Sequence, residues 1–171
     1  KPMICHVLDN LNIPDAKFIL LTRFEHYNNE QKTVKWIKSN YKVEFVMIDK
    51  LTEGAACTVL HAHRLINNDT PLLIANSDQI VDMDISEYIN DSKKRGLDGS
   101  VLCFEDNDKK WSYAKLDKNR FITEIREKEV ISKNATVGIY YFNKGRDFVE
   151  NAIDMIVRNE RVNNEFYVAP V

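Results

Sequence analysis

The sequence predicts an α/β fold in which a mostly parallel central sheet carries helices on both faces. Its first half alternates short apolar runs with helix-patterned segments, the order that a parallel sheet with crossover helices requires. Its second half has several short strands close together, which predicts a small β-rich insertion before the chain returns to the sheet. With 171 residues, 44% of them hydrophobic, the chain is long enough for one domain with a sizeable core.

The elements of the first half follow from the spacing of the apolar residues. Residues 3, 4, 7, 8 and 11 are apolar, which is helical spacing, and Pro14-Asp15 ends this segment. The next apolar run, residues 16–22, predicts a buried strand. The same reasoning gives the remaining elements of this half: helix 25–40, strand 41–48, helix 55–66, strand 72–75 and helix 85–95.

Shorter elements follow the turn bracketed by Gly96 and Gly99. The turn-prone residues Asp117-Lys118-Asn119 separate two of the expected strands. No repeat and no low-complexity linker divides the chain, so residues 1–171 are expected to form a single domain. The elements expected in this half are strands 100–104, 111–116, 121–125 and 135–142, followed by helix 145–157.

Composition excludes several classes of partner. The net charge is −2 and no long basic run is present, which argues against nucleic acid. No apolar stretch approaches the roughly 20 residues that cross a bilayer, so no membrane partner is expected. Cys5, Cys57 and Cys103 lie far apart without CxxC spacing, which favours reduced thiols and a cytoplasmic location.

Both ends of the sequence look internal. It opens on Lys1-Pro2 without an initiator Met, and it closes on Pro170-Val171 directly after an apolar-aromatic segment. Neither end resembles a polar, disordered tail. We therefore expect the 171 residues to be an internal piece of a longer protein, truncated at both ends.

The most informative segment is the apolar run 72–75, which stops at Asn76-Ser77-Asp78-Gln79. Entered through Pro71, it is typical of a strand buried on both faces. In open α/β sheets, ligands collect beyond the carboxyl ends of such strands. A carboxylate there suits the binding of a hard divalent cation against phosphate oxygens. The alternative is an Asx-turn, in which Asp78 accepts hydrogen bonds from nearby backbone N–H groups.

Two further segments carry candidate binding residues. The loop Leu51-Thr52-Glu53-Gly54-Ala55-Ala56 has small residues that let a flat base or a phosphate approach the backbone ahead of a helix. Its alternative is a tight turn with close helix packing. In Glu127-Lys128 a carboxylate can accept sugar hydroxyls while an ammonium pairs with a phosphate. The alternative is an ordinary surface ion pair.

Gly138 and Glu165 are two further candidates, and Gly138 is unusual because glycine weakens a strand. A glycine inside a strand often marks a bulge or the close approach of a ligand. Glu165 either faces the same cleft or faces solvent. His61 and His63 stand two residues apart on a helix and make a poor metal pair, and no arrangement of a nucleophile with a base suggests covalent catalysis.

Taken together, these segments resemble the sugar-phosphate nucleotidyltransferases, the pyrophosphorylases that make nucleotide-sugars on a Rossmann-like GT-A fold. The motifs keep the family's order over nearly the whole chain, although no single one is specific. In this sequence they read Lys1-Pro2-Met3-Ile4, Leu51-Thr52-Glu53-Gly54-Ala55-Ala56, Asn76-Ser77-Asp78, Glu124-Ile125-Arg126-Glu127-Lys128, Thr136-Val137-Gly138-Ile139-Tyr140 and Asn164-Glu165-Phe166-Tyr167.

The resemblance implies a role for each motif. The segment around Glu53, Gly54 and Ala55 would contact the nucleotide base, and Ser77-Asp78 stands at the family's Gly-Asp metal motif for Mg²⁺. Glu127 would reach the sugar and Lys128 the sugar phosphate. The strand with Thr136 and Gly138 would lie beside the sugar, and Glu165 would bond sugar hydroxyls.

Several positions depart from the family pattern. Ser77 replaces a Gly, Glu129 replaces the Pro after the Glu-Lys pair, and Ala114 follows Tyr113 where a Gly often precedes the strand. Ala169-Pro170 replaces a Thr-Asp. The family's Gly-rich loop would lie before Lys1 and its second metal-binding Asp after Val171, so the chain alone is expected to be inactive.

The reaction implied is attack by a sugar 1-phosphate, or a similar phosphorylated small molecule, on the α-phosphorus of a nucleoside triphosphate, with release of pyrophosphate. By family habit the pathway is nucleotide-sugar and bacterial surface-polysaccharide synthesis, and an oligomer is allowed. One alternative is a GT-A glycosyltransferase, although residues 76–79 lack its usual Asp-x-Asp. The other is a non-catalytic nucleotidyltransferase-like module used in regulation or assembly.

Overall fold

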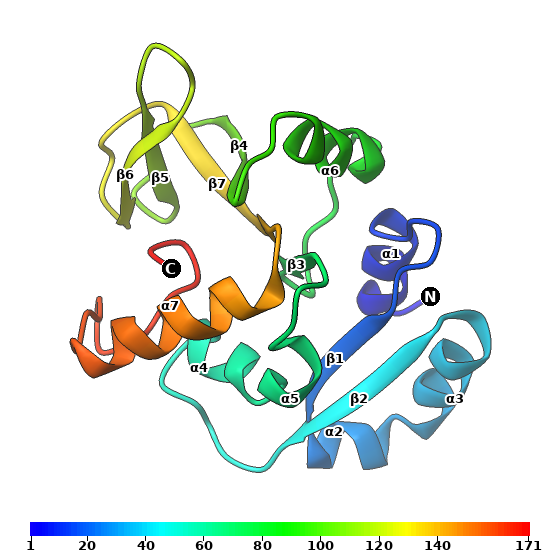
Figure 1. The fold of residues 1–171 in the computed structure, drawn as a ribbon. Helices are drawn as coiled ribbons and strands as arrows, with labels where there is room; N and C mark the ends of the chain where they lie inside the picture. Colours follow the sequence, from blue (N-terminus) through cyan, green and yellow to red (C-terminus); the bar gives the residue numbers. More distant parts are fainter.

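A computed structural model describes residues 1–171 and divides their strands between two sheets (Figure 1). The smaller sheet pairs β1 (Phe18–Arg23) with β2 (Val43–Ile48) in parallel. In the larger sheet the strand order is β3-β7-β5-β6, and β4 lies on the other edge of β7. The strands of this sheet are β3 (Leu72–Ala75), β4 (Gly99–Glu105), β5 (Ser112–Leu116), β6 (Ile122–Glu127) and β7 (Asn134–Phe142).

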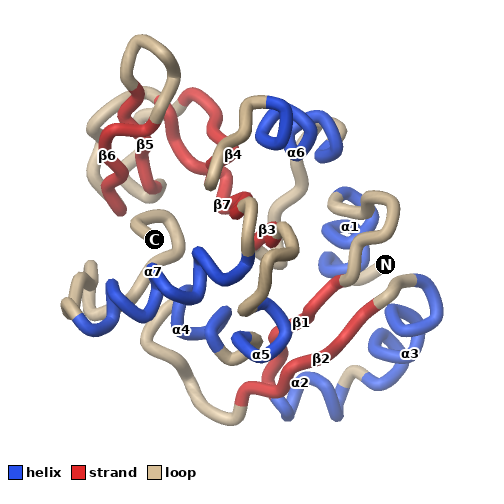
Figure 2. The backbone as a smooth tube through the Cα atoms, viewed as in Figure 1, coloured by secondary structure: helices blue, strands red, loops and turns tan.

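Seven helices surround these sheets, and the α/β class with helices on both faces is confirmed (Figure 2). The expected pairing is only partly correct, because β1–β2 is the one parallel pair. Strand β7 runs opposite to β3, β4 and β5, so every pairing in the larger sheet is antiparallel. The helices are α1 (Met3–Asn10), α2 (Phe24–Asn29), α3 (Gln31–Asn40), α4 (Ala55–Leu60), α5 (His63–Ile66), α6 (Ile85–Lys94) and α7 (Gly145–Val157).

Two predicted helices are each broken into two. The segment expected over 25–40 breaks at Glu30, after Asn28-Asn29, because asparagine side chains compete with the helix backbone for hydrogen bonds. The segment expected over 55–66 breaks at His61-Ala62, where the backbone N–H groups bond three residues back and tighten the last turn.

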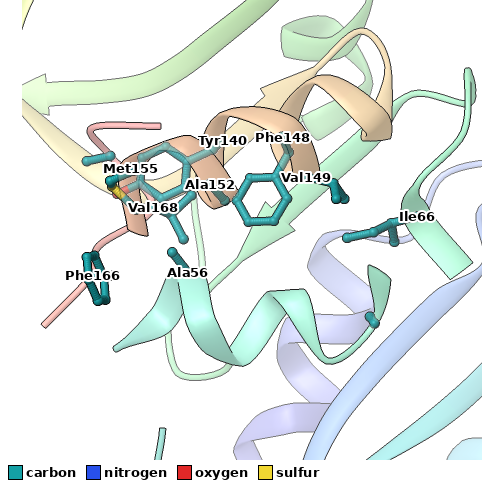
Figure 3. Packing of buried hydrophobic residues seen from close by; sticks show 11 residues of the cluster. Ala56, Ile66, Tyr140, Phe148, Val149, Ala152, Met155, Phe166 and Val168 are labelled. Carbon is teal, nitrogen blue, oxygen red and sulfur yellow. The ribbon is translucent and has the colours of Figure 1, made fainter. Parts of the chain in front are cut away.

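Strand β3 divides the core into two sides, since successive side chains of a strand point to opposite faces. Leu72 and Ile74 pack against the cluster around Phe148, which joins α4, α5 and α7 (Figure 3). Leu73 and Ala75 pack against the cluster contributed by α1, α6 and the other face of β7. The expected burial of β3 on both faces is met in part, because all four residues are half-buried.

The residues of β3 are only half-buried because they line a cavity of about 1620 Å³ between the two sheets. Every residue of β1 and of β3 lines this cavity. Because alternate side chains leave a strand in opposite directions, consecutive residues reach one cavity only along the strand's edge. The edge of β1 away from β2 and the edge of β3 away from β7 have no strand partner. The same cavity extends toward the insertion.

No helix here is long and apolar enough to span a membrane.

Candidate functional site

Asp78 lies on the loop that follows β3, and that loop is fixed at both ends. The Asn76 backbone N–H donates to the Gly138 carbonyl at 3.2 Å, and its Nδ2 donates to Gln79 Oε1 at 2.9 Å. Farther along, Val81 exchanges two hydrogen bonds with the Asn10 side chain, at 2.8 and 3.0 Å. The Asp78 carboxylate is exposed and has no hydrogen bond or ion pair, so the Asx-turn alternative is wrong.

Gly138 holds this loop close to β7. Its φ of +85° is a left-handed conformation that favours glycine, and a Cβ there would lie 2.3 Å from Asn76 Nδ2 and 2.7 Å from Gln79 Oε1. The β4–β7 register shifts between Val101 and Cys103, opposite this position. The bulge interpretation is therefore confirmed. The group that approaches Gly138 in the structure is the Asp78 loop itself, so Gly138 positions Asp78.

Gly54 also serves a contact within the chain. With φ at +114°, it lies so near Phe166 that an added Cβ would be 2.5 Å from the Phe166 carbonyl oxygen. The Phe166 N–H donates to the Glu53 carbonyl at 2.7 Å, and the Ala56 N–H donates back to the Phe166 carbonyl at 3.0 Å. Gly54 therefore allows close packing against the Phe166 backbone, and the predicted contact with a nucleotide base stays a prediction. The Glu53 carboxylate pairs with Arg161 at 3.0 Å, and Ala55 is exposed at the large cavity.

Glu127 lies at the end of β6 in a group of hydroxyl-bearing side chains. It faces Ser112 across the β5–β6 pair, and the Ser112 hydroxyl donates to its carboxylate. Thr136 and Tyr140 project from β7, with their hydroxyl oxygens 3.5 Å apart. Ser112, Thr136 and Tyr140 are buried, and burial raises the pKa of Tyr140. We call these four residues the hydroxyl floor of the cavity.

Lys128 follows β6 in the left-handed region, with φ at +56°. Its backbone N–H donates to the Trp111 carbonyl at 3.1 Å, and its Nζ donates to the Tyr167 hydroxyl at 3.1 Å. The hydrogen bond to Tyr167 holds the pKa of Lys128 above its ordinary value. Glu127 and Lys128 therefore have separate partners, and the surface ion-pair alternative is wrong.

Glu165 is exposed and does not line the cavity, but its carboxylate lies near the Lys128–Tyr167 pair and further raises the pKa of both residues. Its backbone forms an isolated bridge with Val162. Two residues on, Tyr167 does line the cavity.

The structure gathers most of the predicted residues around one hollow. A smaller pocket of about 580 Å³ contains Asp78 and shares Gln79, Trp111 and Val137 with the large cavity. Lys128 reaches the rim through Tyr167, and the Glu165 carboxylate lies near this pair, whereas the Glu53 carboxylate pairs with Arg161. The predicted residues that line the large cavity are Ala55, Ser77, Glu127, Thr136 and Gly138.

Sequence reasoning missed Ser112, Tyr140 and Tyr167 as site residues. The strand register supplies the missing signal for Ser112, because it stands directly opposite Glu127. Tyr140 follows from the period of two along β7, which places it on the face of Thr136. Tyr167 had no local signal, since its contact with Lys128 joins residues 39 positions apart.

Asp78 is the predicted carboxylate ligand for a cation at this site. No group of three or more His, Cys, Asp or Glu side chains is close enough to hold a metal ion. Mg²⁺, however, is usually bound by one or two carboxylates together with substrate phosphates and water. The exposed Asp78 carboxylate fits a site of that kind and does not fit an all-protein cage.

Comparison with known proteins places these features in a family. Residues 1–167 match the family model described as nucleotidyl transferase. The chain is 27% identical over 169 residues to the bifunctional protein GlmU of Methanococcus vannielii, which covers 94% of this chain and 37% of that protein. It is 28% identical over 121 residues to a glucose-1-phosphate adenylyltransferase of Clostridium acetobutylicum. That alignment covers 67% of this chain and 31% of the relative. The chain thus spans about a third of these relatives.

Solved structures share the fold. A nucleoside-diphosphate-sugar pyrophosphorylase from Vibrio cholerae superposes with a TM-score of 0.74 at 20% identity, over 98% of this chain and 70% of that one. HddC from Yersinia pseudotuberculosis gives a TM-score of 0.64 at 16% identity, over 97% of this chain and 67% of that one.

Proposed function

This chain belongs to the nucleotidyl transferase family, among the sugar-phosphate nucleotidyltransferases, and we propose the reaction of its parent protein on that premise. The parent transfers a nucleotidyl group from a nucleoside triphosphate to a sugar 1-phosphate or a similar phosphorylated small molecule, and it releases pyrophosphate. The observation that carries this proposal is the hydroxyl floor around Glu127, bordered by Lys128 and by the Asp78 loop.

The hydroxyl floor suits a polyhydroxylated acceptor. The Glu127 carboxylate accepts hydrogen bonds from acceptor hydroxyls, while the hydroxyls of Thr136 and Tyr140 can donate as well as accept. Lys128 stands directly after Glu127 in the chain, so its ammonium is available to a phosphate carried by the same acceptor. A single molecule with hydroxyls at one end and a phosphate at the other matches this arrangement.

The chemical step joins two anions. A phosphate oxygen of the acceptor attacks the α-phosphorus, that oxygen–phosphorus bond forms, and the bond from the α-phosphorus to the pyrophosphate breaks. Lys128 places positive charge beside the attacking phosphate and holds it in line. Asp78 would hold a Mg²⁺ ion, which when bound supplies positive charge to the triphosphate. No residue of this chain needs to form a covalent intermediate.

A cytoplasmic location is part of the proposal. All three cysteines are free in the structure, a state that reducing compartments maintain.

The test is Asp78→Asn in the full-length protein. We expect at least a 100-fold loss of pyrophosphate release, because the amide cannot supply the anionic ligand. Titration with Mn²⁺ followed by electron paramagnetic resonance should show weaker binding of the ion in the presence of the triphosphate. Asp82→Asn is the matched control, since Asp82 lines the same small pocket four residues later.

Three results would contradict the proposal. Retained activity in Asp78→Asn would overturn the role of Asp78. Equal losses in both variants would mean that only the charge of the loop matters. Release of a nucleoside diphosphate from a nucleotide-sugar, in place of pyrophosphate, would identify a glycosyltransferase.

A further inference from the structure

The contact between Lys128 and Tyr167 joins two parts of the chain that lie 39 positions apart in the sequence. Lys128 ends the β-rich insertion, and Tyr167 belongs to the segment that follows α7. Nζ lies 3.1 Å from the tyrosine oxygen and 5.3 Å from the ring centroid, so the ammonium contacts both the hydroxyl and the aromatic face. Tyr167 is half-buried while Lys128 is exposed, which makes the tyrosine the fixed partner.

Tyr167 is held in place because the neighbouring residue, Phe166, is hydrogen-bonded to the loop before α4 and to its first turn. Phe166 is 1% exposed, and its backbone makes hydrogen bonds on both sides, to Glu53 and to Ala56. The guanidinium of Arg161 lies over the Phe166 ring at 4.4 Å and pairs with Glu53. In Figure 3, Phe166 lies beside the start of α4, where Ala56 is labelled. A displacement of the loop 53–56 must therefore move Phe166, and with it Tyr167.

Lys128 needs an external partner of this kind. A lysine side chain is a flexible four-carbon stem that adopts many rotamers when exposed. The hydroxyl of Tyr167 accepts one N–H of the ammonium and leaves two for an acceptor phosphate. Its position over the ring restricts the stem further.

We propose that Tyr167 is a positioning residue, which holds Lys128 for the acceptor phosphate and links it to the loop 53–56. This inference rests on the proposed function.

The experiment is Tyr167→Phe in the full-length protein, assayed by pyrophosphate release with glucose 1-phosphate as the acceptor probe. Phenylalanine keeps the ring and removes the hydroxyl. We expect KM for the acceptor to rise about tenfold, with kcat falling less than threefold and KM for the nucleoside triphosphate unchanged. An effect confined to the acceptor KM is not expected from a general loss of structure.

The chain offers a matched control in Tyr27→Phe. Lys38 Nζ lies 2.8 Å from the Tyr27 hydroxyl and 5.3 Å from its ring centroid, the same type of contact on α2 and α3. We expect this variant to keep the wild-type acceptor KM. Lys128→Ala completes a double-mutant cycle, in which Tyr167→Phe should add less than twofold once the lysine is absent.

A readout that does not need activity is the pKa of Lys128 by ¹⁵N NMR of its ammonium. The hydroxyl raises the pKa of Lys128 most, and the Glu127 and Glu165 carboxylates add smaller increases that the variant keeps. Removal of the hydroxyl should therefore lower the pKa of Lys128 and move the alkaline decline of acceptor kcat/KM to lower pH. Tyr27→Phe should leave both unchanged.

The outcomes separate this inference from the proposed function. An unchanged pKa of Lys128 in Tyr167→Phe, or an equal rise in acceptor KM with Tyr27→Phe or in the Lys128→Ala background, would overturn the role of Tyr167. A wild-type protein that releases no pyrophosphate, while the pKa of Lys128 still falls in Tyr167→Phe, would overturn the proposed function and leave the contact established.

Discussion

The pair β1–β2 and the strand β7 are built from equally apolar residues but reach different degrees of burial. Residues of β1 and β2 are almost all half-buried, whereas Ala135, Thr136 and the four residues 138–141 of β7 are buried. Strand β7 has neighbours on both edges, β4 on one and β3 and β5 on the other. Strand β1 has only β2.

The difference shows that an apolar strand is buried by its neighbours in the sheet as much as by the helices above and below. The candidate site follows the same division. Its residues lie on or beside β3, β5, β6 and β7 and on the loop before α4, while β1 and β2 carry none. Thr136, Gly138 and Tyr140, which line the cavity, lie on β7, and its neighbours on both edges fix their geometry.

The largest expected effect is on stability, and it contrasts the core around Phe148 with the β1–β2 region. Phe148 is fully buried against α4 and β7, and Phe148→Ala should lower the free energy of unfolding by about 4 kcal/mol through lost burial and a cavity. Phe45 on β2 is half-buried, so Phe45→Ala should cost about 2 kcal/mol. Urea unfolding of the full-length protein measures both. Equal losses would show that the β1–β2 region is as well packed as the other.

A smaller effect separates backbone strain from crowding at the site. Gly96 and Gly138 both have positive φ, but an added Cβ meets nothing within 4 Å at Gly96. Gly96→Ala should cost about 1 kcal/mol of stability, from the left-handed conformation alone. Gly138→Ala should cost about 2 kcal/mol more, because Asn76 and Gln79 must move. The comparison fails if thermal unfolding gives the two variants the same loss.

The smallest effect compares two surface ion pairs. Arg161 pairs with Glu53 and also stacks on Phe166, so Arg161→Ala should cost about 1 kcal/mol. Lys17 pairs with Glu44 between β1 and β2 without an aromatic partner, and Lys17→Ala should cost about 0.3 kcal/mol. Raising the salt concentration should reduce the Lys17 effect more than the Arg161 effect. The reverse salt dependence would contradict a stacking contribution.

The elements of the fold were predictable from hydrophobic spacing. Helix α7 begins at Gly145 and ends at Val157 as predicted, and β3 covers the predicted residues. The breaks in two of the helices could not be predicted in this way. A turn that tightens at His61-Ala62, for example, leaves the apolar spacing unchanged. The antiparallel pairing of β7 was also missed, because the pattern within a strand does not encode the direction of its neighbours.

The candidate site was predictable where a residue type has few uses. Asp78 after an apolar run and Gly138 inside a strand were both singled out, and both lie at the hollow. Gly54 was singled out correctly, but the group that requires its missing side chain is the backbone of Phe166. Contacts of that kind join distant segments and depend on the tertiary structure. The roles of Mg²⁺ and of the binding residues stay predictions.

The unpartnered edges of β1 and β3 have a consequence for what can lie between them. Their backbone N–H and C=O groups are hydrogen-bonding templates for an additional extended segment, as on any open sheet edge. Side chains of such a segment would alternate between the α4–α5–α7 core and the α1–α6 core, both of which are apolar. Only a segment that is hydrophobic at nearly every position satisfies both sides, and until one does, the unpaired amides along these two edges should exchange with solvent faster than the paired amides of β7.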